Sequence, residues 1–81
     1  MAKIAGVDIT DRQLVALHGL YRGLVKTNNT VYGTNVRRQL DALADEGVIS
    51  RTGMSAYMIP YGSPGEAIIA ASRDFVISAH L

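Results

Sequence analysis

Cysteine is absent from the 81 residues of this sequence. This absence excludes disulfide bridges, thiolate zinc sites and thiol nucleophiles. Histidine is scarce too, and His18 and His80 lie in different segments, which is a weak basis for a metal site. No apolar stretch approaches the roughly 20 residues that cross a bilayer, and the N-terminus lacks an apolar run of signal-peptide length. We therefore expect a soluble, cytoplasmic protein without a cofactor or a metal.

A strong charge of either sign is also missing. The formal net charge is +1 at pH 7, whereas nucleic-acid-binding domains usually carry a larger basic excess. The positive excess lies in residues 1–33, while residues 34–61 hold three arginines against three acids. The placement of the arginines therefore matters more for function than their number.

Apolar residues are plentiful enough to build one small core. Hydrophobic residues make up 48% of the chain and charged residues 19%, which is the composition of a folded domain and not of a disordered chain. A chain of this length suggests a single domain over residues 1–81. Such a small domain gains little stability from its core alone and often needs a partner surface.

The apolar pattern predicts a first helix over residues 11–26. Thr10 and Gln13 have the spacing of a capping box, in which each side chain bonds the free backbone amide of the other residue. The apolar stripe of this helix consists of Leu14, Leu17, Tyr21, Leu24 and Val25. Tyr21 is therefore expected in the core, and His18, at the border of the stripe, is expected to be partly buried and hydrogen-bonded.

A second helix is predicted over residues 34–46. Thr34 and Asn35 are both favourable N-cap residues, and Gly47 suits the left-handed conformation that ends many helices. The apolar positions of this helix are Val36, Leu40 and Leu43. Between the two helices, residues 27–33 are polar and are expected to form at most a single turn.

After the second helix the pattern becomes that of a β-hairpin over residues 48–59. Two apolar runs flank a turn at residues 53–55. Pro60 ends the second run because proline cannot donate a hydrogen bond to a strand ladder. A two-stranded hairpin of this length is stable only when it packs against other elements.

A final helix is predicted over residues 64–80. Ser63 and Glu66 have the spacing of a second capping box, and Pro64 occupies the first helical position, where its missing amide hydrogen costs nothing. This helix would carry two apolar stripes, and the second stripe contains Ala70, Ile77 and Leu81. Because a monomer buries only one face of a terminal helix, these three residues are predicted to form a homodimer interface.

Residues 35–51, Asn-Val-Arg-Arg-Gln-Leu-Asp-Ala-Leu-Ala-Asp-Glu-Gly-Val-Ile-Ser-Arg, resemble the recognition helix and first wing strand of winged helix-turn-helix DNA-binding domains. The family pattern is a capped helix, two leucines three residues apart, an acidic-Gly turn, an apolar pair and a basic residue. The matching positions are Leu40, Leu43, Glu46, Gly47, Val48, Ile49 and Arg51. The resemblance implies an α+β, mostly helical fold in which the hairpin at 48–59 is the wing. One departure is that the family places a full helix before the recognition helix, for which residues 27–33 are short. Either the helix-turn-helix unit is abbreviated, or the first helix ends earlier, at Gly19 or Gly23.

The resemblance also implies where DNA would bind. Residues on the outward side of the second helix would face the major groove, where arginine pairs with guanine and asparagine with adenine. The candidate DNA-binding residues are Thr34, Asn35, Arg37 and Arg38, with Arg51 in the wing and Lys26 as a phosphate contact. The alternative is a solvated helix face on which Arg37 and Arg38 form ordinary ion pairs with Asp41. For Lys26, with Arg12 and Arg22, we favour the alternative that these residues are only the solvent-exposed side of an amphipathic first helix.

Two functions remain open at this point. The first is a sequence-specific DNA-binding transcriptional regulator that acts as a small dimer on double-stranded DNA. The second is a non-enzymatic protein-interaction module or inhibitor, from a phage or other mobile element, that reuses the same scaffold. The arginines favour the first, whereas the near-neutral charge and the acids of the second helix favour the second. We expect no enzymatic activity, because the sequence holds no recognisable catalytic motif or glycine-rich phosphate loop.

Overall fold

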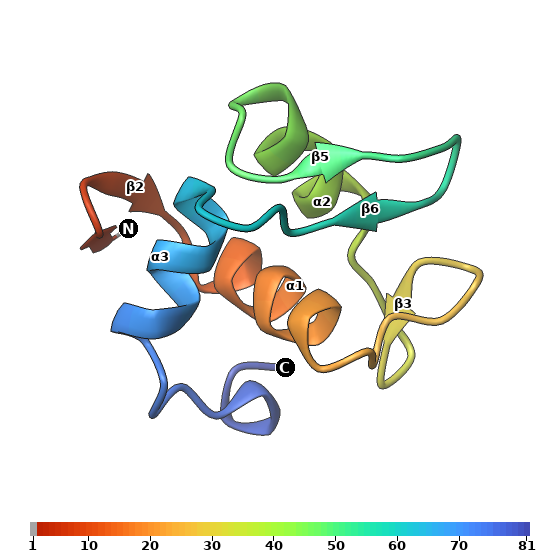
Figure 1. Cartoon of the computed structure of the whole chain (residues 1–81). Coiled ribbons are helices and arrows are strands. Elements are labelled where there is room, and N and C mark those ends of the chain that lie inside the picture. Colours follow the sequence, from red (N-terminus) through yellow and green to blue (C-terminus); the bar gives the residue numbers. More distant parts are fainter. Residues whose placement is uncertain (1) are drawn as a thin grey trace.

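The fold is organised around its first helix, α1 (Asp11–Tyr21). The computed structural model describes residues 2–81, and within them three α-helices and three two-stranded antiparallel sheets occur. Helices α2 (Arg37–Asp45) and α3 (Pro64–Ala71) and a short 3-10 helix, η1 (Ile77–Ala79), each contact α1 (Figure 1). The largest fully buried side chains are those of Ile9, Leu17, Val31, Leu40, Leu43 and Ile68. The predicted α+β class is confirmed.

Helix α1 begins where the capping pattern places it. The Thr10 hydroxyl accepts a hydrogen bond from the Gln13 amide at 3.1 Å, and the Gln13 side-chain oxygen accepts one from the Thr10 amide at 3.0 Å. Asp11 lies in the first turn, where the helix dipole favours a negative charge. The predicted capping box is therefore confirmed.

The end of α1 was predicted too late, at residue 26. Gly23 adopts a φ of 71°, and its amide donates to the carbonyl of Leu20 at 3.2 Å. The Leu24 amide donates to the carbonyl of Gly19 at 2.8 Å, so the helix closes in a Schellman motif. The expectation that Tyr21 is a core residue is also wrong, because the side chain at this last helical position is 63% exposed.

Two hairpins appear that the sequence did not predict. Strand β1 (Ala2–Ile4) pairs with β2 (Val7–Ile9), and β3 (Thr30–Val31) pairs with β4 (Thr34–Asn35). In both turns the two central residues have positive φ, which is the requirement of a type I′ turn. The usual signal for this turn is Asn-Gly or Asp-Gly, whereas these turns contain Ala-Gly and Tyr-Gly.

The β3–β4 hairpin stands where a helix-turn-helix unit would place its first helix. Residues 22–36 contain no helix, so the helix-turn-helix arrangement is not formed and a winged helix is not confirmed. The hairpin packs closely on α1, since a Cβ atom on Gly19 would lie 2.8 Å from Cγ2 of the buried Val31. The expectation of no more than a single turn at residues 27–33 is therefore wrong.

Helix α2 is shorter than the predicted 34–46. Thr34 and Asn35 belong to strand β4, and the N-cap is Val36, whose side chain makes no capping bond. The Asn35 side-chain oxygen instead accepts a hydrogen bond from the Arg37 amide at 3.0 Å. Gly47 ends the helix at a φ of 79°, as predicted.

The hairpin predicted over residues 48–59 is present, although its strands are short. Strand β5 (Ser50–Arg51) pairs in antiparallel fashion with β6 (Tyr57–Met58). Tyr57 is buried at the junction with α2. We call residues 48–59 the wing-like hairpin, a name that describes its place after α2 and not a family.

Helix α3 begins as predicted and ends early. The Ser63 hydroxyl accepts a hydrogen bond from the Glu66 amide at 3.3 Å, while the Glu66 carboxylate accepts one from the amide of Gly62 at 3.2 Å and not from Ser63. The helix ends at Ala71, and the predicted continuation to residue 80 is wrong. The Ser72 hydroxyl bonds the Ile68 carbonyl at 2.5 Å, which competes with continuation of the helix.

The early end of α3 removes the basis for the predicted dimer interface. Ile77 lies in η1, is 2% exposed and belongs to the core of its own chain. Ala70 and Leu81 are exposed but share no helix with Ile77. The second apolar stripe therefore does not exist as a helix face. Among the helices of residues 2–81, none is both long enough and apolar enough to span a membrane.

Candidate functional site

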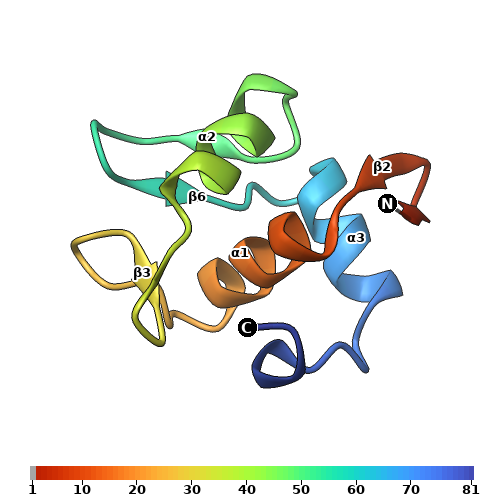
Figure 2. The same cartoon turned by 180° about the vertical axis from the view of Figure 1, so that it is seen from behind.

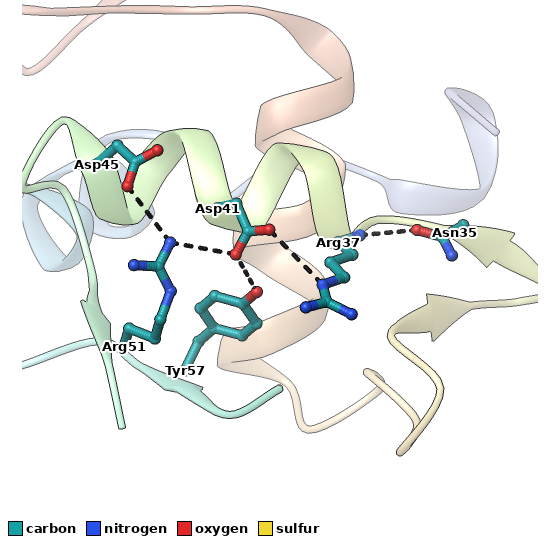
Figure 3. Close-up of polar contacts among 6 residues, drawn as sticks. All are labelled: Asn35, Arg37, Asp41, Asp45, Arg51 and Tyr57. Atoms are coloured by element: carbon teal, nitrogen blue, oxygen red, sulfur yellow. Dashed lines mark hydrogen bonds and ion pairs between the residues drawn. The ribbon is translucent and has the colours of Figure 1, made fainter. Parts of the chain in front are cut away.

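The outer face of α2 is joined to the wing-like hairpin by a polar network centred on Asp41 (Figure 3). One carboxylate oxygen of Asp41 accepts a hydrogen bond from the Tyr57 hydroxyl and lies 3.2 Å from Nη2 of Arg51. The other oxygen lies 3.7 Å from Nε of Arg37. Arg51 also reaches Asp45, at 3.4 Å. We call these five residues the Asp41 network.

The Asp41 network balances its own charges. The hydrogen bond from Tyr57, followed by the bond and charge of Arg51, lowers the pKa of Asp41. The carboxylates of Asp41 and Asp45 raise the pKa of Arg51. Burial, followed by the bond to Asp41, raises the pKa of Tyr57. Because two guanidinium groups face two carboxylates, this part of the surface offers little net charge to a ligand.

The predicted DNA-binding arginines therefore differ in their availability. Arg51 is held by two carboxylates, and Arg37 forms the helix-spaced pair with Asp41 that the alternative interpretation predicted. Arg38 is exposed, and no acid within residues 2–81 forms an ion pair with it. The expected pair between Arg38 and Asp41 is not formed. Arg38 is the predicted arginine whose charge is available for a ligand.

The remaining predicted residues lie beside the beginning of α2. Asn35, Arg37 and Arg38 line one shallow depression on the outer face of the helix. Thr34 and Asn35 are exposed in β4 and also line a pocket of about 220 Å³. Lys26 is exposed in the loop before β3. In both views this loop and the tip of the wing-like hairpin extend on the same side of the molecule (Figures 1 and 2).

A second surface was missed by the sequence analysis. A hollow of about 500 Å³ opens between the end of α1, the segment before α3 and α3 itself. Its lining consists of His18, Tyr21, Arg22, Tyr61, Glu66, Ile69, Ala70 and Arg73. Tyr61 is 96% exposed. Its position directly after Pro60, which ends the wing-like hairpin, is the sequence signal that Tyr61 lies outside that hairpin. We call this surface the α1–α3 hollow.

His18 forms part of the wall of the α1–α3 hollow. Its Nε2 lies 2.8 Å from the Ser72 hydroxyl oxygen, and that hydroxyl already donates to the Ile68 carbonyl. His18 Nε2 must therefore carry the hydrogen and donate to Ser72. Burial, followed by the charge of Arg22, lowers the pKa of His18, which favours the neutral ring. The expected buried and hydrogen-bonded histidine is confirmed.

The His18 ring is also fixed from its other side. Phe75 stacks on His18 with ring centroids 5.0 Å apart, and His80 stacks on Phe75 at 4.6 Å. This stack attaches the chain after α3 to α1. Within residues 2–81 no three histidine, aspartate or glutamate side chains gather in a group that would hold a metal ion.

Comparison of the chain with protein families, curated proteins and solved structures finds no significant match. The candidate binding surfaces of the molecule are the beginning of α2 and the α1–α3 hollow.

Proposed function

We propose that this chain is a DNA-binding regulator that contacts double-stranded DNA through the beginning of α2. The observation that supports the proposal is the state of Arg38. It is exposed on the first turn of α2, and no acid in the described part of the chain pairs with it. Arginine is the side chain most often used for specific contacts with guanine in the major groove.

Neighbouring groups complete the proposed contact. Asn35 uses its side-chain oxygen to bond the Arg37 amide, so its NH₂ group remains to donate to a base or a phosphate. Thr34 is exposed beside it in β4. Lys26, exposed in the loop before β3, would add a phosphate contact, which positions a protein on DNA without selecting a sequence.

The acids of α2 affect how strongly the chain would bind DNA of any sequence. Asp41 and Asp45 would repel a phosphate backbone, but Arg37 and Arg51 already compensate their charges. Sequence-independent affinity for DNA depends on the number of phosphates that a protein neutralises. With a net charge of +1, we expect weak non-specific binding and a shallow dependence of affinity on salt.

The test measures binding to a mixture of genomic DNA fragments at low and at physiological salt, followed by the Arg38→Ala variant on any selected fragment. Loss of a base contact should weaken binding by about 1–3 kcal/mol, which is about 5- to 150-fold. Arg73→Ala removes the same charge from the α1–α3 hollow and serves as the matched control. Absence of binding even at low salt, where electrostatic contacts are strongest, would contradict the proposal.

A second candidate function, a non-enzymatic protein-interaction module, is favoured by a separate observation. The α1–α3 hollow exposes two tyrosines and two arginines, which are residue types enriched at the centres of protein interfaces. A homodimer remains a prediction of the DNA-binding proposal, because it would present two equal DNA contacts to a two-fold site. Sedimentation equilibrium of the full chain at micromolar concentration tests it, and a monomer would reject it.

A further inference from the structure

We infer that the α1–α3 hollow binds an acidic peptide segment of a partner protein, in which a carboxylate side chain lies next to an apolar or aromatic one. This surface shares no lining residue with the depression at the beginning of α2. The inference therefore does not rest on the DNA-binding proposal. It assigns a partner chemistry to the second candidate function.

Part of the lining of the α1–α3 hollow is apolar. Ile69 is buried in the floor of the hollow and Ala70 lies beside it, while the exposed rings of Tyr21 and Tyr61 form its rim. An exposed tyrosine contributes a large apolar area and loses little side-chain entropy when it is covered. The lining therefore suits an aliphatic or aromatic side chain of a partner.

The lining of the α1–α3 hollow also carries a net positive charge. Arg22 and Arg73 both face the hollow, and neither forms an ion pair with any acid of residues 2–81. The lining holds one carboxylate, that of Glu66, which accepts a hydrogen bond from the neutral amide of Gly62 and keeps its charge, so two guanidinium charges face one carboxylate charge. Burial, followed by the charge of Arg22, lowers the pKa of His18 and favours the neutral ring. The uncompensated charge is thus positive, and the planar guanidinium group matches a carboxylate in a bidentate pair.

The placement of these charges suits a peptide better than a nucleic acid. A single strand of nucleic acid places a phosphate at every nucleotide, so one of them would approach Glu66. A peptide can place its carboxylate at Arg22 or Arg73 and an uncharged residue at Glu66. The volume of about 500 Å³ is also in the range of sites that enclose a few side chains and not an extended strand.

The test selects binders from a display library of random 12-residue peptides on the immobilised full chain. We expect the selected peptides to be enriched in Asp and Glu next to Leu, Ile, Phe or Tyr. Arg73→Glu should weaken their binding at least about 10-fold, because a guanidinium–carboxylate pair becomes a pair of like charges. Tyr61→Ala, at a side chain too exposed to support the fold, should weaken binding by a smaller factor.

The controls make the inference falsifiable. Arg12→Glu changes the net charge equally but lies outside the hollow, so it should bind the selected peptides like the wild-type chain. Selected peptides without acidic enrichment, or peptides that bind Arg73→Glu unchanged, would overturn the inference. Preferential binding of oligothymidylate in the hollow would overturn it in favour of a nucleic acid. Arg38→Ala should leave peptide binding intact, which keeps failure here distinct from failure of the DNA proposal.

Discussion

The Asp41 network and the α1–α3 hollow contain the same types of side chain and differ in what those side chains contact. In the Asp41 network, Arg51 and Tyr57 are both bonded to one carboxylate. In the hollow, Arg22 and Arg73 lie beside exposed tyrosines and form no ion pair within residues 2–81. Arginine and tyrosine therefore stabilise the fold on one surface and remain available for a ligand on the other.

The difference shows why a matching motif is not yet a binding site. Arg51 matches the basic residue of the winged-helix pattern, yet its guanidinium group joins the wing-like hairpin to α2 through Asp41 and Asp45. No motif points to Arg73. Which arginine is available for a ligand depends on the acidic side chains that the fold brings near it. The ion pairs that occupy exposed arginines contribute only modestly to stability.

The largest predicted effect concerns the junction between the two regions. Gly65 in α3 donates its amide to the carbonyl of Val48, the residue that leads into the wing-like hairpin, at 2.9 Å. A Cβ atom at Gly65 would lie 2.7 Å from that oxygen and 3.1 Å from Cγ2 of Ile49. Gly65→Ala should therefore lower the free energy of unfolding by about 1–3 kcal/mol, measured by urea denaturation.

Gly53→Ala is the matched control for this junction. A Cβ atom at Gly53, in the turn of the wing-like hairpin, would meet only Cβ of Ala56, at an ordinary 3.6 Å. Its effect on stability should stay within about 0.5 kcal/mol. Equal stability of Gly65→Ala and the wild-type chain would show that the two regions are not joined as tightly as the geometry indicates.

A smaller predicted effect is a pH dependence of the free energy of unfolding, which comes from His18 in the α1–α3 hollow and not from the Asp41 network. The pKa of His18 is lowered by burial and by Arg22, so the unfolded chain binds a proton more readily than the folded one. Stability from the neutral ring is fully present above about pH 6.5 and is lost as pH falls through the folded pKa. Between pH 7.5 and 5.5 this loss is at most about 1.4 kcal/mol.

Urea denaturation at the two pH values measures this loss, and nuclear magnetic resonance titration of the ring follows His18 directly. His18→Gln should remove most of the pH dependence, while substitutions in the Asp41 network should leave it in place. An unchanged dependence in His18→Gln would assign it to another group.

The smallest effect concerns the Asp41 network itself. Tyr57→Phe removes the hydroxyl that contributes most to the lowered pKa of Asp41. The pKa of Asp41 should move back toward its ordinary value of 3.8, as followed by carbon-detected titration of the carboxyl group. The cost in stability at pH 7 should be about 0.5–1 kcal/mol, because the carboxylate is partly solvated. An unchanged pKa of Asp41 would show that the Tyr57 hydroxyl does not act on this carboxylate.

The sequence predicted the elements whose signals are local. The reciprocal bonds of Thr10 and Gln13, the left-handed glycine at position 47 and the proline at the first position of α3 are all present. Each depends on contacts within a few residues of the chain. For the same reason the inward positions of α2, Leu40 and Leu43, were identified correctly as core.

Elements fixed by distant contacts were predicted less well. The apolar period of residues 64–80 continues past Ala71, but the buried Ser72 bonds His18 and thereby favours a break that brings Ile77 into the core. The β3–β4 turn places Tyr32 at a φ of 49°, which is uncommon for a large side chain. The close packing of this hairpin against Gly19 accounts for the unusual turn. Because Gly19 lies outside the hairpin, no pattern within residues 30–35 predicts this contact.

The residues around the outer face of α2 were named from the sequence, but of their pairings only that of Arg37 with Asp41 was both predicted and formed. Arg37, Arg38, Asn35 and Arg51 do lie around the outer face of α2. The bond between Tyr57 and Asp41 joins residues 16 positions apart, and the helix-spaced rule considers only three or four. The α1–α3 hollow combines residues from three separate segments, so no single stretch of the sequence predicts it.

The three small sheets have a consequence for how the chain folds. Each hairpin pairs neighbours in sequence, and even the widest pairing, Ser50 with Met58, closes a short loop. Short loops cost little entropy to close, and local pairing accelerates folding. The bond from His18 to Ser72 spans 54 positions, so docking of α3 onto α1 is the step that requires a long search. We expect the hairpin pairings to be sampled early and to persist once they pack on the helices, and the α1–α3 hollow to take shape last.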